Sequence, residues 1–266
     1  MKPPANIYAY IRVVILIGLI LTTPGYAAID PETAVAVWLF NEGEGNEVKD
    51  ETDNPANLTG VLKGREITWI KGVYGNAVNL GVDGDVVAVS AAFGDEAAPT
   101  EEITIVAWIR WNPKNNTDLF FFVPPEPWDN RIAVHFPWGA DGIAWQFGRP
   151  MANLNAPMPK NFEDDWHHVA FTGSGKNMAI LIDGKIVADR AGVTPFVRGN
   201  NRAWHIGGRA GTTFEGGVDE VAVFNVVLTQ ADIKAIKNRG LSHAVGLAVD
   251  PSDKLTTAWG NIKSRD

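Results

Sequence analysis

The stretch AILIDGKIVAD, from Ala179 to Asp189, decides the fold of this chain. Two runs rich in apolar residues flank the pair Asp183 and Gly184. A two-residue turn between antiparallel strands needs a positive φ at both central positions, and an Asp-Gly pair adopts that conformation at low cost. The stretch therefore predicts a tight β-hairpin between two neighbouring strands.

Similar short apolar runs, separated by glycine, asparagine and aspartate, recur along the chain. They lie at 34–40, 85–90, 103–111, 131–136, 142–147, 167–173 and 178–182. Helical periodicity is almost absent before Thr229. Many short strands separated by turn signals predict an all-β chain, and at this length they favour two packed antiparallel sheets over a barrel or an α/β fold.

One short helix is expected near the C-terminal end, in LTQADIKAIKNRG at 228–240. Thr229 can cap its first turn together with Asp232, and Gly240 can end it. Two isoleucines form an apolar edge on the segment. The helix is therefore expected to be an addition to a sheet protein.

The N-terminal segment, residues 1–27, differs from the rest of the chain. Lys2 and Arg12 precede or border a short apolar run, and no acid occurs before Asp30. This pattern is typical of a secretory signal peptide, with cleavage expected after Ala27. The apolar run is too short to cross a bilayer of roughly 30 Å as a helix, so no stable membrane span is expected after cleavage. A permanent anchor is the alternative, and the predicted location is periplasmic or secreted.

Charge and composition exclude some classes of protein. The formal net charge is −8, and cleavage after Ala27 would remove two cations and no acid. The mature chain would therefore be more negatively charged, which does not suit binding to nucleic acid. Without cysteine, the exported protein has no disulfides. We expect one sandwich domain at 28–242, long enough for a sizeable core, and a C-terminal tail at 243–266, where the strand rhythm stops.

Three blocks carry a family resemblance. They are VWLFNEGEGNEVKDET (37–52), WHHVAFTGSGKNMAILIDGKIV (166–187) and FEGGVDEVAVFNVVLTQADI (214–233). In order and spacing they resemble the laminin-G-like, concanavalin A-like jelly-roll family, including its pentraxin-related bacterial members. The resemblance implies a two-sheet antiparallel jelly-roll sandwich. It leaves the function open, because this fold occurs in lectins, sugar-binding modules, adhesion domains and glycosidases.

The acids of the third block do not form a glycosidase pattern. Retaining glycosidases hold two carboxylates about 5 Å apart, and the laminarinase-like relatives carry them as Glu-x-Asp-x-(x)-Glu on one strand. Here Asp219 and Glu220 are adjacent, so an extended strand would direct them to opposite faces, and Val221 and Val223 follow. We therefore expect a non-catalytic binding module, with a laminarinase-like glycoside hydrolase as an alternative.

Neighbouring histidines, His167 and His168, stand at the start of another predicted strand. Successive strand residues project to opposite sides, so the two cannot chelate one metal ion without a bulge. We expect one of them to make a structural hydrogen bond.

The tryptophans divide into two groups. Trp38, Trp108 and Trp166 lie in strands that match the family blocks, so we expect them in the core. The others of interest lie outside these blocks, beside hydrogen-bonding side chains: Trp111, Trp128, Trp138, Trp145 and Trp204. A flat ring beside polar groups can hold a sugar.

We therefore predict a glycan-binding surface that includes Trp128, Arg131, Trp138 and Arg149. The alternative is an adhesion or surface-structural domain that binds an extracellular protein. It would be favoured if the aromatic rings of 111–150 were fully buried.

A calcium site is expected at the mouth of the last long strand. Asp219 enters an apolar run without a nearby Lys or Arg, and burial of an unpaired carboxylate is costly, so a hard cation is a suitable partner. The family resemblance places Glu42 opposite Asp219, with Asp50 in reach. We expect these three residues to bind a structural calcium ion, and Glu220 to turn toward solvent or a basic side chain. The alternative is that the acids cap turns and accept backbone N–H groups.

Overall fold

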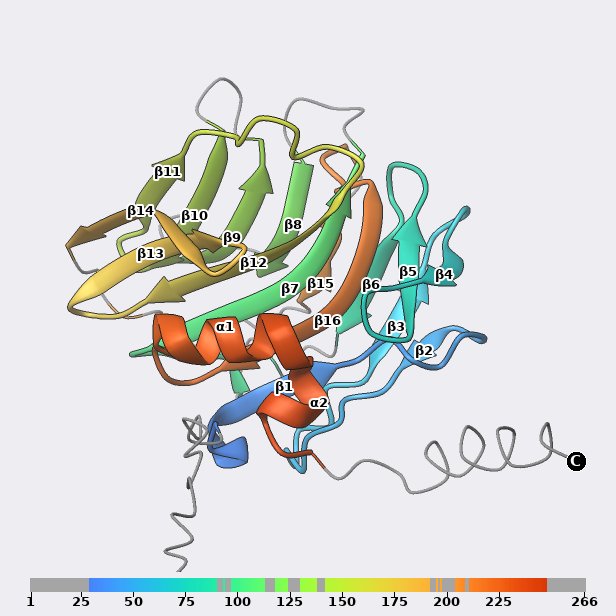
Figure 1. Cartoon of the computed structure of the whole chain (residues 1–266), viewed down its shortest axis with the longest axis horizontal. Helices are drawn as coiled ribbons and strands as arrows, with labels where there is room; N and C mark the ends of the chain where they lie inside the picture. Colours follow the sequence, from blue (N-terminus) through green and yellow to red (C-terminus); the bar gives the residue numbers. More distant parts are fainter. Residues whose placement is uncertain are drawn as a thin grey trace, which may run out of the picture.

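The computed structural model describes residues 29–89, 93, 97–112, 118–123, 130–137, 142–191, 195, 197, 204–208 and 211–247. In this part of the chain two antiparallel sheets pack face to face, and a pair of short helices lies outside one of them (Figure 1). The predicted all-β sandwich is thereby confirmed. The predicted signal peptide lies outside the described residues, and none of the described helices is long and apolar enough to span a membrane.

The sheet that carries the helices is called here the helix-side sheet. Its strands lie in the order β14 (Lys185–Ala191), β13 (Asn177–Ile182), β12 (Trp166–Gly173), β7 (Ile103–Trp111), β16 (Gly216–Phe224), β5 (Asn76–Leu80) and β4 (Thr68–Lys71), and β1 (Ala34–Trp38) also pairs with β16. The paired strands of this sheet are antiparallel.

The second layer is called the opposite sheet. Its order is β11 (Ala152–Ala156), β10 (Ile143–Gly148), β9 (Arg131–Phe136), β8 (Asp118–Val123), β15 (His205–Ile206), β6 (Val86–Val89), β3 (Gly60–Lys63) and β2 (Glu47–Val48). The helical elements are η1 (Pro31–Thr33), α1 (Gln230–Arg239) and α2 (Leu241–Ala244).

The hairpin that joins β13 to β14 forms at the predicted place. Asp183 and Gly184 both have positive φ, 50° and 74°, as a two-residue hairpin turn requires. The Asp183 carboxylate also anchors the neighbouring strand, because Oδ2 lies 2.8 Å from Nδ1 of His167 and Oδ1 accepts the backbone N–H of His168. The structural hydrogen bond expected of one of the two histidines is therefore confirmed for His167.

Three tryptophans of the core between the sheets, Trp38, Trp145 and Trp204, have no exposed surface. Trp38 packs on Trp204 with ring centroids 5.3 Å apart, and Trp145 donates its indole N–H to the carbonyl of Thr172 at 2.8 Å. Trp111 is also buried. Trp111, Trp145 and Trp204, which the sequence offers as candidates for sugar contact, therefore lie in the core. Trp145, for example, alternates with polar Gln146 and shares the inward phase of its strand.

The predicted helix forms with its cap. Thr229 and Asp232 make a reciprocal capping box, and Gly240 follows the last turn with φ of 78°. Ile233 and Ile236 bury one side of α1 against the outer face of the helix-side sheet. Burial of one such side chain stabilises the fold by about 1.5 to 3 kcal/mol.

The packed body continues past the predicted domain end at residue 242. Leu241, Ala244 and Val245 are buried in the same apolar cluster as α1. The stretch that the sequence assigns to a tail therefore begins with residues that complete this layer.

The helices cover only part of the helix-side sheet. Figure 1 shows α1 crossing in front of β7 and β16, while both strands run on beyond it. The outer face of that sheet thus has a covered half and a half without a helix.

Candidate functional site

A polar row crosses the half of the helix-side sheet that α1 leaves uncovered. Trp166 in β12 pairs with Arg110 in β7, Arg110 with Gly217 in β16, Gly217 with Asn79 in β5, and Asn79 with Thr68 in β4. The residues next to them in β7, β16 and β5 point into the core between the sheets, so these five face outward. We call them the outer row.

The ring of Trp166 lies across the sheet. A Cβ atom on Gly217 would come within 2.7 Å of Cη2 and 3.0 Å of Cζ2 of Trp166, so the ring occupies the space that a side chain at Gly217 would need. The guanidinium carbon of Arg110 lies 5.5 Å from the ring centroid, within the range of a cation–π contact. Trp166 is half-buried, and the expectation that it belongs to the core is wrong.

The polar groups of the outer row have no other partners in the described part of the chain. Arg110 makes only its ring contact, and the side chains of Asn79 and Thr68 make no hydrogen bond there. The row therefore offers an aromatic ring, a fork of guanidinium donors, an amide and a hydroxyl. This combination suits a ligand with an apolar C–H face and a rim of polar groups.

A second, buried row separates the outer row from α1. His168 pairs with Trp108, and Trp108 pairs with Asp219. The rings of His168 and Trp108 meet edge to face at 5.4 Å, and Lys237 of α1 places its Nζ 5.9 Å from the Trp108 ring. Burial lowers the pKa of His168 to about 3, so its imidazole stays neutral. His168 and Trp108 thus form a neutral aromatic pair beside the outer row.

The acids of β16 are both buried, and both hold backbone groups. Oδ2 of Asp219 accepts the N–H groups of Val73 and Tyr74 at 2.8 and 3.1 Å. Glu220 has a φ of 49° at a β-bulge, and its carboxylate accepts the N–H of Leu241 at the start of α2. The expectation that Glu220 turns toward solvent or a basic side chain is therefore wrong. Burial raises the pKa of Asp219 to about 7 and that of Glu220 to about 8.

The other two predicted calcium ligands serve as turn anchors. Asp50 accepts the backbone N–H groups of Val37 and Leu58 at 3.1 and 3.3 Å. Glu42 accepts that of Lys49 at 2.8 Å. These contacts match the alternative in which the acids satisfy backbone donors.

The structure does not bring the predicted calcium ligands together. In the described ranges no three His, Asp or Glu side chains form a group that could hold a metal ion, and Glu42, Asp50 and Asp219 all lie within those ranges. The arrangement thus gives no support to the three-residue site, which stays a prediction. Oδ1 of Asp219 is buried without a hydrogen-bond partner in the same part of the chain, so a cation at Asp219 itself stays a prediction.

Two of the four predicted glycan-binding residues, Arg131 and Arg149, lie in the described structure. Trp128 and Trp138 lie outside the described residues. Arg131 is nine-tenths buried in β9, where Nη1 donates to Gln146 at 2.8 Å. Arg149 is exposed at the end of β10. Arg131 thus takes part in a buried polar contact on the outer face of the opposite sheet.

Sequence reasoning missed the outer row, although part of its signal was present. In β12, Val169 and Phe171 face the core, whereas Trp166 shares the phase of His168 and Ala170 on the outer face. Alternation along this strand was therefore sufficient to place Trp166 outside the core.

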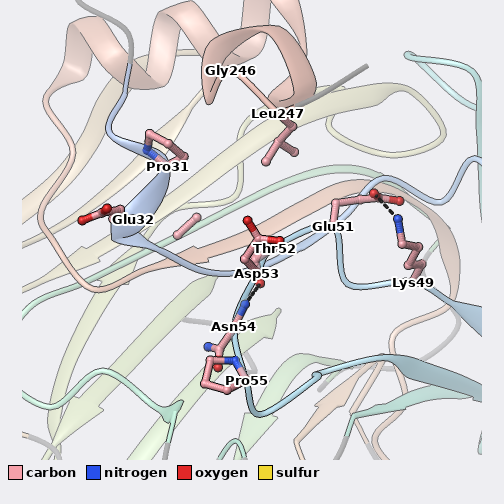
Figure 2. Close-up of a pocket in the computed structure, with 11 residues that line it drawn as sticks. Pro31, Glu32, Lys49, Glu51, Thr52, Asp53, Asn54, Pro55, Gly246 and Leu247 are labelled. Carbon is pink, nitrogen blue, oxygen red and sulfur yellow. Dashed lines mark hydrogen bonds and ion pairs between the residues drawn. The ribbon is translucent and has the colours of Figure 1, made fainter. Parts of the chain in front are cut away.

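A cavity of about 860 Å³ lies on another part of the surface, between η1, the segment 49–55 and the end of α2 (Figure 2). Lys49 and Glu51 form an ion pair of 2.7 Å in it, and the Asn54 amide donates to the carbonyl of Val35. Its lining residues are Pro31, Glu32, Ala34, Lys49, Glu51, Thr52, Asp53, Asn54, Pro55, Gly246 and Leu247. None of the described residues that line this cavity has an aromatic ring, so it is less suited to a sugar than the outer row.

Comparison with known proteins identifies the family. Residues 75–234 match the model of the concanavalin A-like lectin/glucanases superfamily. None of the curated proteins matches the chain in sequence. Among solved structures, domain 4 of AbnA, a GH43 extracellular arabinanase from Geobacillus stearothermophilus in complex with arabinotriose, is similar with a TM-score of 0.62 and 18% identity. The match covers 77% of this chain and 98% of that domain.

Toxin binding domains share the fold as well. The binding domain of Paraclostridial Mosquitocidal Protein 1 has a TM-score of 0.61 at 13% identity, over 78% of this chain and 52% of that one. The binding domain of botulinum neurotoxin DC, in complex with SialylT, has a TM-score of 0.59 at 14% identity, over 78% and 51%. This chain thus spans about half the length of these toxin domains. At such identities the likeness shows the fold alone, but the family model matches more than half of the sequence. The chain therefore belongs to the concanavalin A-like lectin/glucanase superfamily.

Proposed function

We propose that this protein is an exported, non-catalytic module that binds a carbohydrate on its outer row. The observation that carries the proposal is the half-buried Trp166, whose ring lies over Gly217 beside Arg110 and Asn79, side chains that make no hydrogen bond in the described residues. A sugar ring presents axial C–H groups that pack on an aromatic face and hydroxyls that bond to an amide or guanidinium.

The similar structures support a carbohydrate as the ligand class. Domain 4 of AbnA was solved with arabinotriose, and the binding domain of botulinum neurotoxin DC was solved with SialylT. Each complex shows what that other protein binds. Together they make a saccharide the first class of ligand to test here. Export is inferred from the signal-peptide pattern of residues 1–27.

Absence of catalysis is supported by the state of the acids in β16. Asp219 and Glu220 are buried and bound to backbone N–H groups, and no acid follows them on the strand. A retaining glycosidase needs a nucleophile and a proton donor that face each other across an open cleft. We expect no reducing ends above a buffer blank on incubation with β-glucans, agars or chitin.

A glycan array tests the proposed function. The chain from residue 28 onward is applied as wild type, Trp166→Ala and Lys176→Ala. Lys176 is exposed in the turn between β12 and β13, away from the outer row, so it serves as the matched surface control. Wild type and the control should bind the same glycans, and Trp166→Ala should lose them while it keeps its melting temperature within a few degrees.

A protein ligand is the second candidate, and it has its own observation. Trp111 and Trp145 are buried, as that alternative requires, and the edge strand β14 exposes Ile186 and Val187 to 51% and 37%. Exposed apolar residues on a sheet edge can pair with a strand of another protein. A flat glycan array for correctly folded wild type would favour this candidate over the carbohydrate.

A further inference from the structure

Arg110 is half-buried, and in the described residues its guanidinium has no carboxylate partner. Its one contact in the described chain is the ring of Trp166. Long charged side chains that are partly withdrawn from water are usually paired, because loss of hydration is costly for the charge. Arg110 is therefore held in position by packing and remains available to an anion.

Acids close to the outer row in sequence leave Arg110 unpaired. Glu163, Asp164 and Asp165 immediately precede Trp166 and are exposed, but none forms an ion pair with Arg110. The backbone N–H of Asp164 instead bonds to the carbonyl of Trp111 at 2.9 Å, which fixes the turn at the end of β7.

Behind the outer row lie a second cation, Lys237, and a buried acid, Asp219. Lys237 lies over the ring of Trp108 without an ion pair in the described residues, and His168 is buried and neutral. The carboxylate of Asp219 is buried and accepts two backbone N–H groups, and it forms no ion pair with Arg110 in the described residues. Arg110 and Lys237, which have no ion pair in the described residues, thus lie on this face of a protein whose formal net charge is −8.

We infer that the outer row selects saccharides that carry a carboxylate, and that Arg110 binds this group. The inference rests on the proposed function. A planar guanidinium matches a carboxylate with two parallel hydrogen bonds, whereas an ammonium provides only a point charge. The ring of Trp166 then packs on the C–H face of the sugar, and the Asn79 amide and Thr68 hydroxyl bond to its hydroxyls.

Pairs of acidic and neutral saccharides measure the contribution of the carboxylate to affinity. Calorimetry is performed with oligogalacturonate and its carboxyl-reduced counterpart, and with sialyllactose and lactose. At least one acidic sugar should bind wild type about tenfold or more tightly than its neutral partner, as expected for a charge-assisted bidentate contact. Its affinity should fall as salt concentration rises.

Substitutions of Arg110 and Trp166 test which of them determines the preference for acidic over neutral saccharides. Arg110→Gln should remove the preference for the acidic member, and Arg110→Lys should restore only part of it. Trp166→Phe should weaken both members and keep their ratio. Lys176→Gln removes a cation of the same charge from an exposed turn and should change nothing. Melting temperatures of all variants verify that they are folded.

Three other outcomes would contradict either the inference alone or the proposed function with it. Equal binding of neutral and acidic members, unchanged by Arg110→Gln, would overturn the inference and leave the proposed function standing. An equal loss in Arg110→Gln and Lys176→Gln would assign selectivity to overall charge and overturn the role of Arg110. No binding of any saccharide by folded wild type would overturn the proposed function together with the inference.

Discussion

Trp166 and Gly217 are placed so that a side chain on one would displace the ring of the other. They lie on β12 and β16, with Arg110 of β7 between them, and a Cβ atom at Gly217 would lie 2.7 Å from Cη2 of Trp166. The ring is the movable partner, because Trp166 is half-buried at the surface. The missing side chain at Gly217 therefore sets the orientation of the surface ring.

The first prediction is that Gly217→Ala weakens saccharide binding more than it weakens the fold. The new methyl group must push the Trp166 ring out of its place, whereas the loss of glycine flexibility offsets part of the cost in stability. We expect about a tenfold loss of affinity by calorimetry and a change of less than about 1 kcal/mol in unfolding free energy.

A double-mutant cycle provides the control for this prediction. In a Trp166→Phe background the shorter ring does not reach over Gly217, so Gly217→Ala should have a much smaller effect. An unchanged affinity of the single Gly217→Ala variant would contradict the proposed role of the ring.

The second prediction concerns the hairpin turn. Gly184 has a φ of 74°, and a Cβ there would meet Cγ of Lys234 at 2.7 Å. Gly184→Ala should lower the unfolding free energy by about 1 kcal/mol or slightly more, because the backbone conformation disfavours side chains. Chemical denaturation measures this change. Lys234→Ala serves as the matched variant, since it removes the contact but keeps the backbone cost, and full rescue in the double variant would contradict the dihedral explanation.

Local signals explain what the sequence predicts correctly. The turn at Asp183 and Gly184 and the cap formed by Thr229 and Asp232 depend on residues within one short segment, so propensity and spacing define them. The apolar runs likewise locate the strands to within a few residues, because their pattern is set by burial along the same segment.

The site depends on relations that no single segment contains. The contact between Arg110 and Trp166 follows from the register of β7 against β12, and the ring position depends on Gly217 in a third strand. Pairing of distant strands cannot be read from one strand. Likewise, alternation predicts opposite faces for Asp219 and Glu220, whereas the bulge at Glu220 directs its carboxylate to α2.

The third prediction is a loss of stability with rising pH through neutrality. Burial raises the pKa of Asp219 to about 7 and that of Glu220 to about 8 in the folded protein, from 3.8 and 4.5. The fold therefore holds more protons than the unfolded chain, and the contribution of both acids is fully present below about pH 4 and is lost as the pH rises through 7 and 8. His168 acts oppositely, because its lowered pKa costs stability only below about pH 6.5.

Urea denaturation between pH 6.5 and 9 measures this effect. The unfolding free energy of wild type should fall by a few kcal/mol across the range, because each acid costs about 1.4 kcal/mol per pH unit until it has lost its proton in the folded protein. In Glu220→Gln the fall should be smaller, because the amide oxygen still accepts the Leu241 N–H but carries no charge. A stability that rises between pH 6.5 and 8 would contradict the burial of these acids.

The last prediction is a calcium effect that depends on Asp219. Its Oδ2 accepts two backbone N–H groups, while Oδ1 is buried without a hydrogen-bond partner among the described residues. A buried carboxylate oxygen in this state is a suitable ligand for a hard cation, which would also relieve the cost of the charge. At calcium a hundredfold above its dissociation constant, binding to the folded state alone adds about 2.7 kcal/mol. The melting temperature of wild type should therefore be higher in calcium than in chelator, and Asp219→Asn should lose the difference.

Asp50→Asn is the matched control: Asp50 anchors the backbone of Val37 and Leu58, so its removal should lower the melting temperature in both buffers and keep the calcium shift. A wild type that melts at the same temperature in both buffers would rule out the ion, and a shift retained by Asp219→Asn would place it elsewhere.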